Sequence, residues 1–235
     1  MSPSKQNPSP SGTLYVVATP IGNLGDISFR AVTTLREVDF IVCEDTRKSG
    51  ILLKKYDIHS PQILSFHAHS SQNKIDKIIS ILQSGKSGAL ISDAGTPGIS
   101  DPGFRLILLA KENKIKTSPI PGASAFLAAL SASSFPSNRF SFYGFLPQKK
   151  GKNKVLKEIA DLDKTAIFYE SPNRIVRTLE KALEFFPDRE ICVAREISKV
   201  YEEFIYGRAS ELLEKFQEKA PKGEIVVLVC PPCKP

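Results

Sequence analysis

The chain has 235 residues, of which 41% are hydrophobic, and it carries 32 basic against 25 acidic side chains, a net charge of +7. This length accommodates one large domain or two small ones with buried cores, and no apolar run reaches the ~18 residues that a membrane-spanning helix needs. The basic excess favours polyanionic partners, RNA above all, although a basic protein without such a partner has the same composition.

In the first half of the chain, short apolar segments alternate with segments of helical periodicity. Residues 1–12 are rich in Pro and Ser and lack an apolar stretch, so they are expected to form a disordered arm and not a secretory signal. Ser28 is expected to cap the first helix. The predicted strands are residues 13–19, 39–44, 87–92 and 114–120, and the predicted helices are 28–38, 46–56, 75–85, 103–113 and 123–133. This alternation predicts a mostly parallel sheet covered on both faces.

The second half has several consecutive strands without intervening helices, which predicts a mixed sheet. The predicted strands are residues 139–147, 164–170, 189–196, 201–207 and 223–229. A basic turn leads into a first helix within residues 148–157, and the other predicted helices are 171–186 and 210–219. Ser171 and Pro172 are expected at the N-cap and first position of the middle helix. The predicted organisation is an arm at 1–12, an N-terminal α/β domain at 13–121 and a C-terminal α/β domain at 122–235.

The four cysteines do not suggest a disulfide framework. Cys43 and Cys192 lie in apolar strand-like segments and are expected in the core. Cys230 and Cys233 form a single C-P-P-C near the end of the chain, and neither this pair nor the H-A-H sequence has further ligands at metal-site spacing. We therefore expect no metal site and a reducing, cytoplasmic compartment.

Three loops at predicted strand ends share an unusual composition. They are TPIGNLGD at 19–26, SDAGTPGISDPG at 92–103 and PIPGASA at 119–125. Glycine lets a ligand approach the backbone, proline limits the entropy lost on binding, and aspartate accepts hydrogen bonds. A Walker lysine and a complete G-x-G-x-x-G are both absent, which disfavours a phosphate-rich nucleotide and favours a zwitterionic ligand with hydroxyls and an aromatic base.

Seven motifs in order carry a resemblance to a known family. They are LYVVATPIGNLGDIS, EDTRKSGILL, SDAGTPGISDPG, PIPGASA, FYGFLPQKKGK, FYESPNR and AREISKVYEE. From about Thr13 to Val229 the chain closely resembles the ribosomal RNA small subunit methyltransferase I family, within the tetrapyrrole methylase superfamily. The resemblance implies two α/β domains with S-adenosylmethionine bound between them. It also implies a homodimer that methylates the ribose 2′-hydroxyl of a cytidine in the decoding centre of 16S rRNA, free or in the 30S subunit.

By the same resemblance, the motifs supply the residues that bind the donor. They are Pro20, Gly22, Asp93, Ala94, Gly95, Thr96, Pro97, Ile99, Asp101, Pro121, Gly122, Ala123 and Ser124, with Gly144, Phe145, Leu146 and Gly223 from the second domain.

The reaction needs a group that accepts the hydroxyl proton, because a neutral ribose hydroxyl is a poor nucleophile. Several carboxylates could do this, each also able to serve in an ion pair. The cluster Glu44, Asp45 and Arg47 is preferred because it follows a buried strand. The basic run after the fifth predicted strand is the candidate for contacting RNA phosphates, through Lys149, Lys150, Lys152 and Lys154.

Two other functions remain open at this stage. The same fold and donor loops would serve methylation of a tetrapyrrole carbon in a precorrin or uroporphyrinogen. A non-catalytic RNA-binding factor in ribosome assembly would share the basic balance.

Overall fold

The computed structural model describes residues 12–59, 62–148 and 150–232. The chain divides between Ala123 and Ser124 into two compact units. The predicted arm, Lys149 and Cys233 lie wholly or almost wholly outside the described residues, so the predictions made for them stay predictions.

The first unit is built on a parallel sheet of five strands in the order β3-β2-β4-β1-β5. The strands are β1 (Thr13–Val17), β2 (Phe40–Cys43), β3 (Ile63–Ser65), β4 (Gly88–Leu90) and β5 (Lys116–Ile120). The helices are the 3-10 turn η1 (Leu24–Asp26), α1 (Phe29–Glu37), α2 (Thr46–Lys55), α3 (Gln72–Gln83) and α4 (Gly103–Glu112). The predicted parallel α/β architecture is confirmed, and Ser28 caps α1 by accepting from Ala31 N at 3.1 Å.

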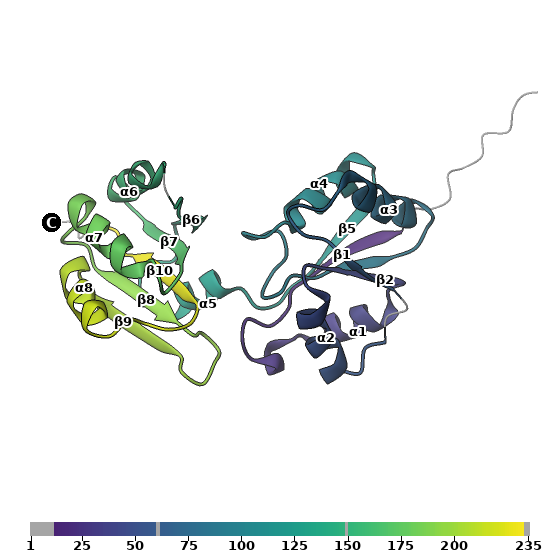
Figure 1. The fold of residues 1–235 in the computed structure, drawn as a ribbon, viewed down its shortest axis with the longest axis horizontal. Helices are drawn as coiled ribbons and strands as arrows, with labels where there is room; N and C mark the ends of the chain where they lie inside the picture. The colour runs from purple at the N-terminus through teal and green to yellow at the C-terminus, as the bar shows by residue number, and fades with distance from the viewer. Residues whose placement is uncertain (1–11, 60–61, 149, 233–235) are drawn as a thin grey trace, which may run out of the picture. The chain divides into compact units, whose positions relative to one another are not determined.

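Helices cover both faces of this sheet, α1 and α2 on one side and α3 and α4 on the other (Figure 1). Successive side chains of a strand point to opposite faces. In β2, Phe40 and Val42 therefore pack with α3 and α4, whereas Ile41 and Cys43 pack with α1 and α2. All four are fully buried, which is why the strand is continuously apolar.

The second unit contains a mixed sheet in the order β6-β7-β10-β8-β9, in which β6 and β7 are parallel and the remaining neighbours are antiparallel. The strands are β6 (Phe140–Phe145), β7 (Thr165–Glu170), β8 (Ile191–Arg195), β9 (Glu203–Gly207) and β10 (Ile225–Val229). The helices are α5 (Ala125–Ala132), α6 (Lys152–Ala160), α7 (Ile175–Phe185) and α8 (Ala209–Glu218).

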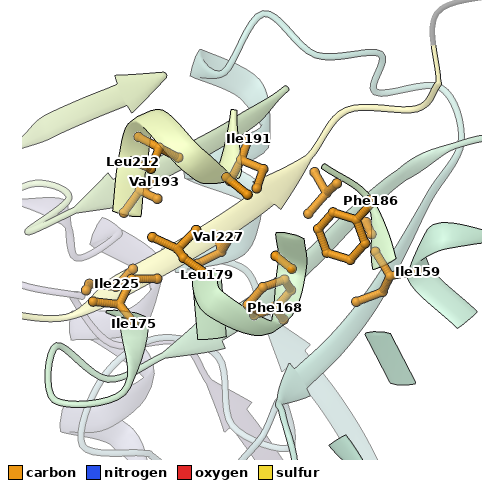
Figure 2. Packing of buried hydrophobic residues seen from close by; sticks show 14 of the residues in the cluster. Ile159, Phe168, Ile175, Leu179, Phe186, Ile191, Val193, Leu212, Ile225 and Val227 are labelled. Carbon is orange, nitrogen blue, oxygen red and sulfur yellow. The ribbon is translucent and has the colours of Figure 1, made fainter. Parts of the chain in front are cut away.

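The main core of this unit lies between the sheet and helices α6, α7 and α8. Phe168, Leu179, Val193 and Val227 contribute to this core, which Figure 2 shows from close by. The opposite face of the sheet packs against α5, where Phe126 stacks on Phe142 with ring centroids 4.3 Å apart.

Two sequence predictions about elements were wrong. β3 was not expected, and it pairs with β2 through the register Ile41↔Ile63. Helix α7 begins at Ile175 and not at Ser171, because the Ser171 amide donates to Glu170 Oε1 at 2.8 Å. Residues 171–174 instead form a turn, closed by Arg174 N donating to the Ser171 carbonyl at 3.0 Å.

Candidate functional site

The three Gly- and Pro-rich loops leave neighbouring strands at one edge of the first unit. They follow β1, β4 and β5, which are adjacent in the order β4-β1-β5 and run parallel. We call the edge where these strands end the carboxyl edge. Open α/β sheets bind ligands there, where successive connections leave in opposite directions.

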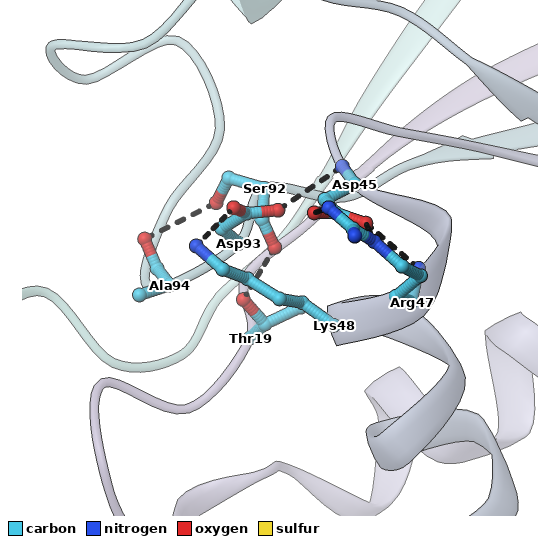
Figure 3. Close-up of polar contacts among 7 residues, drawn as sticks. All are labelled: Thr19, Asp45, Arg47, Lys48, Ser92, Asp93 and Ala94. Atoms are coloured by element: carbon cyan, nitrogen blue, oxygen red, sulfur yellow. Dashed lines mark hydrogen bonds and ion pairs between the residues drawn. The ribbon is translucent and has the colours of Figure 1, made fainter.

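The loops after β1 and β4 are joined by hydrogen bonds. Thr19 and Gly95 form an isolated bridge, with Thr19 N donating to the Gly95 carbonyl at 2.9 Å and Gly95 N to the Thr19 carbonyl at 3.1 Å. The Thr19 hydroxyl donates to the Ser92 carbonyl at 3.1 Å, and the Ser92 hydroxyl lies 3.2 Å from the Ala94 carbonyl and 3.0 Å from that of Gly95 (Figure 3). Both hydroxyl side chains are buried, so they define the loop conformation.

The loops after β4 and β5 are joined as well. Thr96 Oγ1 donates to the Ala123 carbonyl at 3.1 Å. A Cβ on Gly122 would lie 2.9 Å from the Ala18 Cβ, closer than real Cβ contacts, so only glycine allows the third loop this near to β1. Gly95 has φ +81°, a conformation that other residues rarely adopt. The three loops thus form one connected structure.

Asp101 shapes the second loop from within. Its carboxylate accepts Gly98 N at 2.8 and 3.0 Å and Gly103 N at 2.6 Å, which joins the end of the loop to the start of α4. The other residues expected at the donor divide into two groups. Pro20 and Pro97 are buried and support the loops, whereas Gly22, Ala94, Ile99 and Pro121 are exposed.

The acidic segment, Glu44 and Asp45, follows β2, which is the neighbour of β4. Its two carboxylates have different surroundings. Asp45 is the N-cap of α2 and accepts Arg47 N at 2.9 Å. Arg47 also donates to it through Nε at 3.1 Å and Nη2 at 2.8 Å (Figure 3). These hydrogen bonds lower the pKa of Asp45 to about 2, so it is a poor proton acceptor.

The pKa of Glu44 is shifted in the opposite direction from that of Asp45. Partial burial raises its pKa above the ordinary value, and the nearby carboxylates of Asp101 and Asp93 raise it further, whereas Lys48 lowers it. A carboxylate whose ionised form is destabilised has a higher affinity for a proton. Glu44 is therefore the member of the predicted catalytic cluster that is suited to acid–base chemistry.

Sequence reasoning did not single out Lys48, Thr19 or Ser92. Lys48 Nζ forms an ion pair with Asp93 Oδ2 at 2.8 Å, which connects α2 to the loop after β4. Lys48 lies four residues after Glu44, a spacing at which side chains near the start of a helix can interact. This spacing was the only feature of the sequence that could have pointed to Lys48. Nothing local in the sequence distinguishes Thr19 and Ser92 from other loop hydroxyls.

The carboxyl edge fits the kind of ligand that the sequence predicted, a zwitterion with hydroxyls and an aromatic base. Glycines without side chains lie beside accepting carbonyls and carboxylates, and this combination suits hydroxyls, an amine and a positively charged centre. Asp93, with a quarter of its side chain exposed, has the acceptor capacity for such a ligand.

The second unit contributes four residues that were expected at the donor, and they have different surroundings. Gly144, at φ +61°, lies where the pairing of β6 with β7 shifts register. Phe145 is 57% exposed, and its ring lies 5.4 Å from that of Tyr169. The side chain of Leu146 belongs to the core, so only its backbone can meet a ligand. Gly223 lies against Glu196, which leaves no room for a Cβ.

The basic run at the start of α6 differs from the sequence expectation at Lys152. Its Nζ donates to Thr178 Oγ1 at 2.6 Å and lies 3.7 Å from Glu170 Oε2, and its side chain is 13% exposed. Glu170 is itself buried and paired with Arg174 at 2.6 Å. Lys152 thus belongs to a buried charged cluster, whereas Lys150 and Lys154 are exposed.

Cys43 and Cys192 are fully buried, as expected for core residues. Across residues 12–59, 62–148 and 150–232 no group of three His, Cys, Asp or Glu side chains has a metal-site arrangement. In the same part of the chain, every helix is too short or too polar to span a bilayer.

Comparison with known proteins adds an independent line of evidence. Residues 13–213 match the model of the tetrapyrrole (corrin/porphyrin) methylases. The chain is 44% identical to "Ribosomal RNA small subunit methyltransferase I" of Thermotoga maritima, over 93% of this chain and 98% of the relative. It is 49% identical to the protein of the same name from Streptococcus pyogenes serotype M3, over 93% of this chain and 76% of the relative.

Solved structures show the same fold at low sequence identity. A cobalt precorrin-4 methyltransferase superposes with a TM-score of 0.68 at 14% identity, covering 93% of this chain and 94% of the other. A uroporphyrin-III C-methyltransferase from Thermus thermophilus, complexed with S-adenyl homocysteine, gives 0.65 at 16% identity, covering 93% and 97%.

Proposed function

Because the chain belongs to the tetrapyrrole methylase family, and within it to the ribosomal RNA small subunit methyltransferase I group, we propose that it methylates the ribose 2′-hydroxyl of a cytidine in the decoding centre of 16S rRNA. It is an S-adenosylmethionine-dependent rRNA methyltransferase. The observation that carries the proposal is the linkage of the three donor loops at the carboxyl edge, beside an acidic segment that follows β2.

We assign donor binding to the backbone of these loops and to the carboxylate of Asp93. Thr19, Ser92 and Thr96 tie the loops together, so little conformational entropy is left to lose on binding. Asp101 supports this arrangement through the amides of Gly98 and Gly103.

We assign proton removal to Glu44. When bound, S-adenosylmethionine would supply a methyl group activated by a positively charged sulfur, which would leave as a neutral thioether. Glu44 takes the hydroxyl proton, and its raised pKa suits this task. Asp45 has a structural role, because Arg47 and the start of α2 already occupy its carboxylate.

Exposed lysines of the second unit are the proposed phosphate contacts. Lys150 and Lys154 are exposed, and the predicted contact Lys149 lies outside the described residues. We do not include Lys152, because its ammonium already binds Thr178 and Glu170. The net charge of +7 favours the same partner.

The two alternative functions are less well supported. The tetrapyrrole methyltransferases share the fold at 14–16% identity, whereas the rRNA methyltransferases match at 44–49%. A non-catalytic assembly factor would have no need for an acid of raised pKa beside intact donor loops.

A methyl-transfer assay tests the proposal. The purified protein is incubated with labelled donor and either unmethylated 30S subunits, naked 16S rRNA or a precorrin, with Glu44→Gln as the inactive control. Label at one cytidine 2′-oxygen, mapped by mass spectrometry of nuclease fragments, is the expected result. Label in the precorrin, or in no substrate, would refute the proposal.

We also propose a cytoplasmic homodimer. Large apolar side chains that are strongly exposed in the single chain support this, with Phe29 at 95%, Val200 at 92% and Tyr201 at 73%. Sedimentation at micromolar concentration should give twice the mass of one chain, and a monomer would contradict the assignment.

A further inference from the structure

Lys48 lies in the first turn of α2, directly after β2, and it reaches across to the donor loop. Its Nζ donates to Asp93 Oδ2 at 2.8 Å, although Asp93 belongs to the loop after β4. β2 and β4 are neighbours in the sheet, with Phe40 opposite Gly88, so both connections start from the same edge. The two side chains are 65% and 23% exposed, and the lysine is the more accessible partner.

The second oxygen of Asp93 also binds the start of α2. Asp93 Oδ1 accepts Asp45 N at 3.2 Å, and this amide belongs to the peptide that follows Glu44 (Figure 3). One carboxylate is thus held by the backbone on one side and by an ammonium on the other. Two hydrogen bonds to Asp93, one from the Asp45 amide and one from Lys48 Nζ, therefore connect the segment that follows β2 to the loop after β4.

Lys48 is also the cation that balances the charges around Glu44. The carboxylates of Asp93 and Asp101 both raise the pKa of Glu44, while Asp45 is neutralised by its bonds to Arg47. Cys43, which precedes Glu44, is buried and uncharged, because burial raises the pKa of its thiol. Without Lys48, the effects of Asp93 and Asp101 on the pKa of Glu44 would lose the opposing effect of this ammonium.

From this geometry we propose that Lys48 is a positioning residue, which holds Asp93 against the start of α2 and so sets Glu44 in place relative to the donor loop. The inference rests on the proposed function, since it concerns the residue to which we assign proton removal. Lys48 acts through Asp93 and Glu44, and it takes no proton itself, because its pairing with Asp93 raises its own pKa.

Three variants separate this role from a purely structural one. Lys48→Met removes the charge and retains the aliphatic stem, and Lys48→Arg retains the charge. Lys54→Met is the matched control, since Lys54 is an exposed lysine near the other end of the same helix. The measurements are kcat between pH 5.5 and 9.5, S-adenosylhomocysteine affinity by calorimetry and the melting temperature.

For Lys48→Met we expect kcat at pH 7 to fall roughly two- to five-fold, as expected for loss of a partly exposed ion pair. The acid limb of the pH profile should move to higher pH, because ionised Glu44 loses the favourable electrostatic interaction with Lys48. Lys48→Arg should restore the limb, and Lys54→Met should match the wild type. An unmoved limb in Lys48→Met, or equal losses in the Met and Arg variants, would overturn the inference.

A substrate-free measurement distinguishes failure of this inference from failure of the proposed function. The carboxyl carbon of Glu44 is titrated by NMR in 13C-glutamate-labelled protein and assigned with Glu44→Gln. The midpoint should be higher in Lys48→Met than in the wild type, whether or not rRNA is methylated. An unchanged midpoint refutes the role of Lys48, whereas wild-type protein that leaves rRNA unlabelled refutes the proposed function alone.

Discussion

Replacement of Asp101 by asparagine should weaken donor binding without unfolding the protein. The carboxylate accepts Gly98 N at 2.8 and 3.0 Å and Gly103 N at 2.6 Å, so it holds the end of the second donor loop on the start of α4. Gly98 has φ +86°, and the loop thus includes a backbone conformation that needs support. Asparagine keeps the shape of the side chain but has one acceptor oxygen and no charge.

The size of the effect follows from the two amides. A hydrogen bond to a charged acceptor contributes about 1.5–3 kcal/mol, against about 0.5–1.5 kcal/mol for a neutral one, so each amide loses ~1 kcal/mol. Two amides give ~2 kcal/mol for ordering the loop, or roughly 30-fold in the affinity of a donor that needs the ordered loop. Loss of the Asp101 charge also removes repulsion at Glu44, whose pKa should fall towards the ordinary value.

Calorimetry with S-adenosylhomocysteine measures the affinity, and hydrogen exchange at Gly98 and Gly103 measures the order of the loop. The melting temperature should change little, because the loop opens locally. Asp161→Asn, an exposed cap of α6 in the other unit, is the control. Wild-type affinity together with wild-type exchange rates in Asp101→Asn would refute the reasoning.

Three further predictions follow from the structure. Glu44→Gln should lower kcat about 10²- to 10⁴-fold with little change in donor affinity. Folding raises the pKa of Glu44 above its ordinary value, so ionisation of Glu44 destabilises the folded state as pH rises through that pKa. The variant should therefore melt higher than the wild type at pH 7 and at the same temperature near pH 4. An equal difference at both pH values would contradict this. Gly88→Ala should destabilise the first unit by about 1–3 kcal/mol in urea unfolding, because the alanine Cβ would lie 2.3–2.7 Å from ring atoms of buried Phe40. A second substitution in the same chain, Phe40→Leu, should recover part of this loss of stability. Lys150→Glu with Lys154→Glu should weaken rRNA binding and reduce the slope of log affinity against log salt by about 2 in filter binding, and an unchanged slope would exclude these lysines as phosphate contacts.

Part of the fold follows from local pattern alone. Apolar β-strands alternating with helical periodicity predicted the parallel sheet of the first unit, and consecutive strands predicted the mixed sheet of the second. The strand β3 was missed because it has three residues and only partial burial, so its pairing with β2 supplies most of its stability. The start of α7 was misplaced because the Ser171 amide donates to the buried Glu170 carboxylate, and residues 171–174 form a turn instead of the first turn of the helix.

The candidate site was predictable as a set of loops but not as an arrangement of charges. Composition and family resemblance pointed to the three loops to which we assign donor binding and to the segment containing Glu44 and Asp45. The different environments of these two acids were not predictable, because Arg47 binds the carboxylate of Asp45, whereas Asp93 and Asp101, far along the chain in the loop after β4, raise the pKa of Glu44. Lys152 has the same lysine-rich neighbours as Lys154, yet its side chain packs against Glu170 at the end of β7.

The amino-acid sequence by itself determined most of the segments that form strands, the loops that follow them and the family that the chain resembles, because these depend on neighbours along the chain. Only the tertiary structure decided that the loops after β4, β1 and β5 are adjacent and hydrogen-bonded, and that Lys48 meets Asp93. Strand order, burial and the field at a carboxylate arise from groups far apart in sequence, so no local pattern records them.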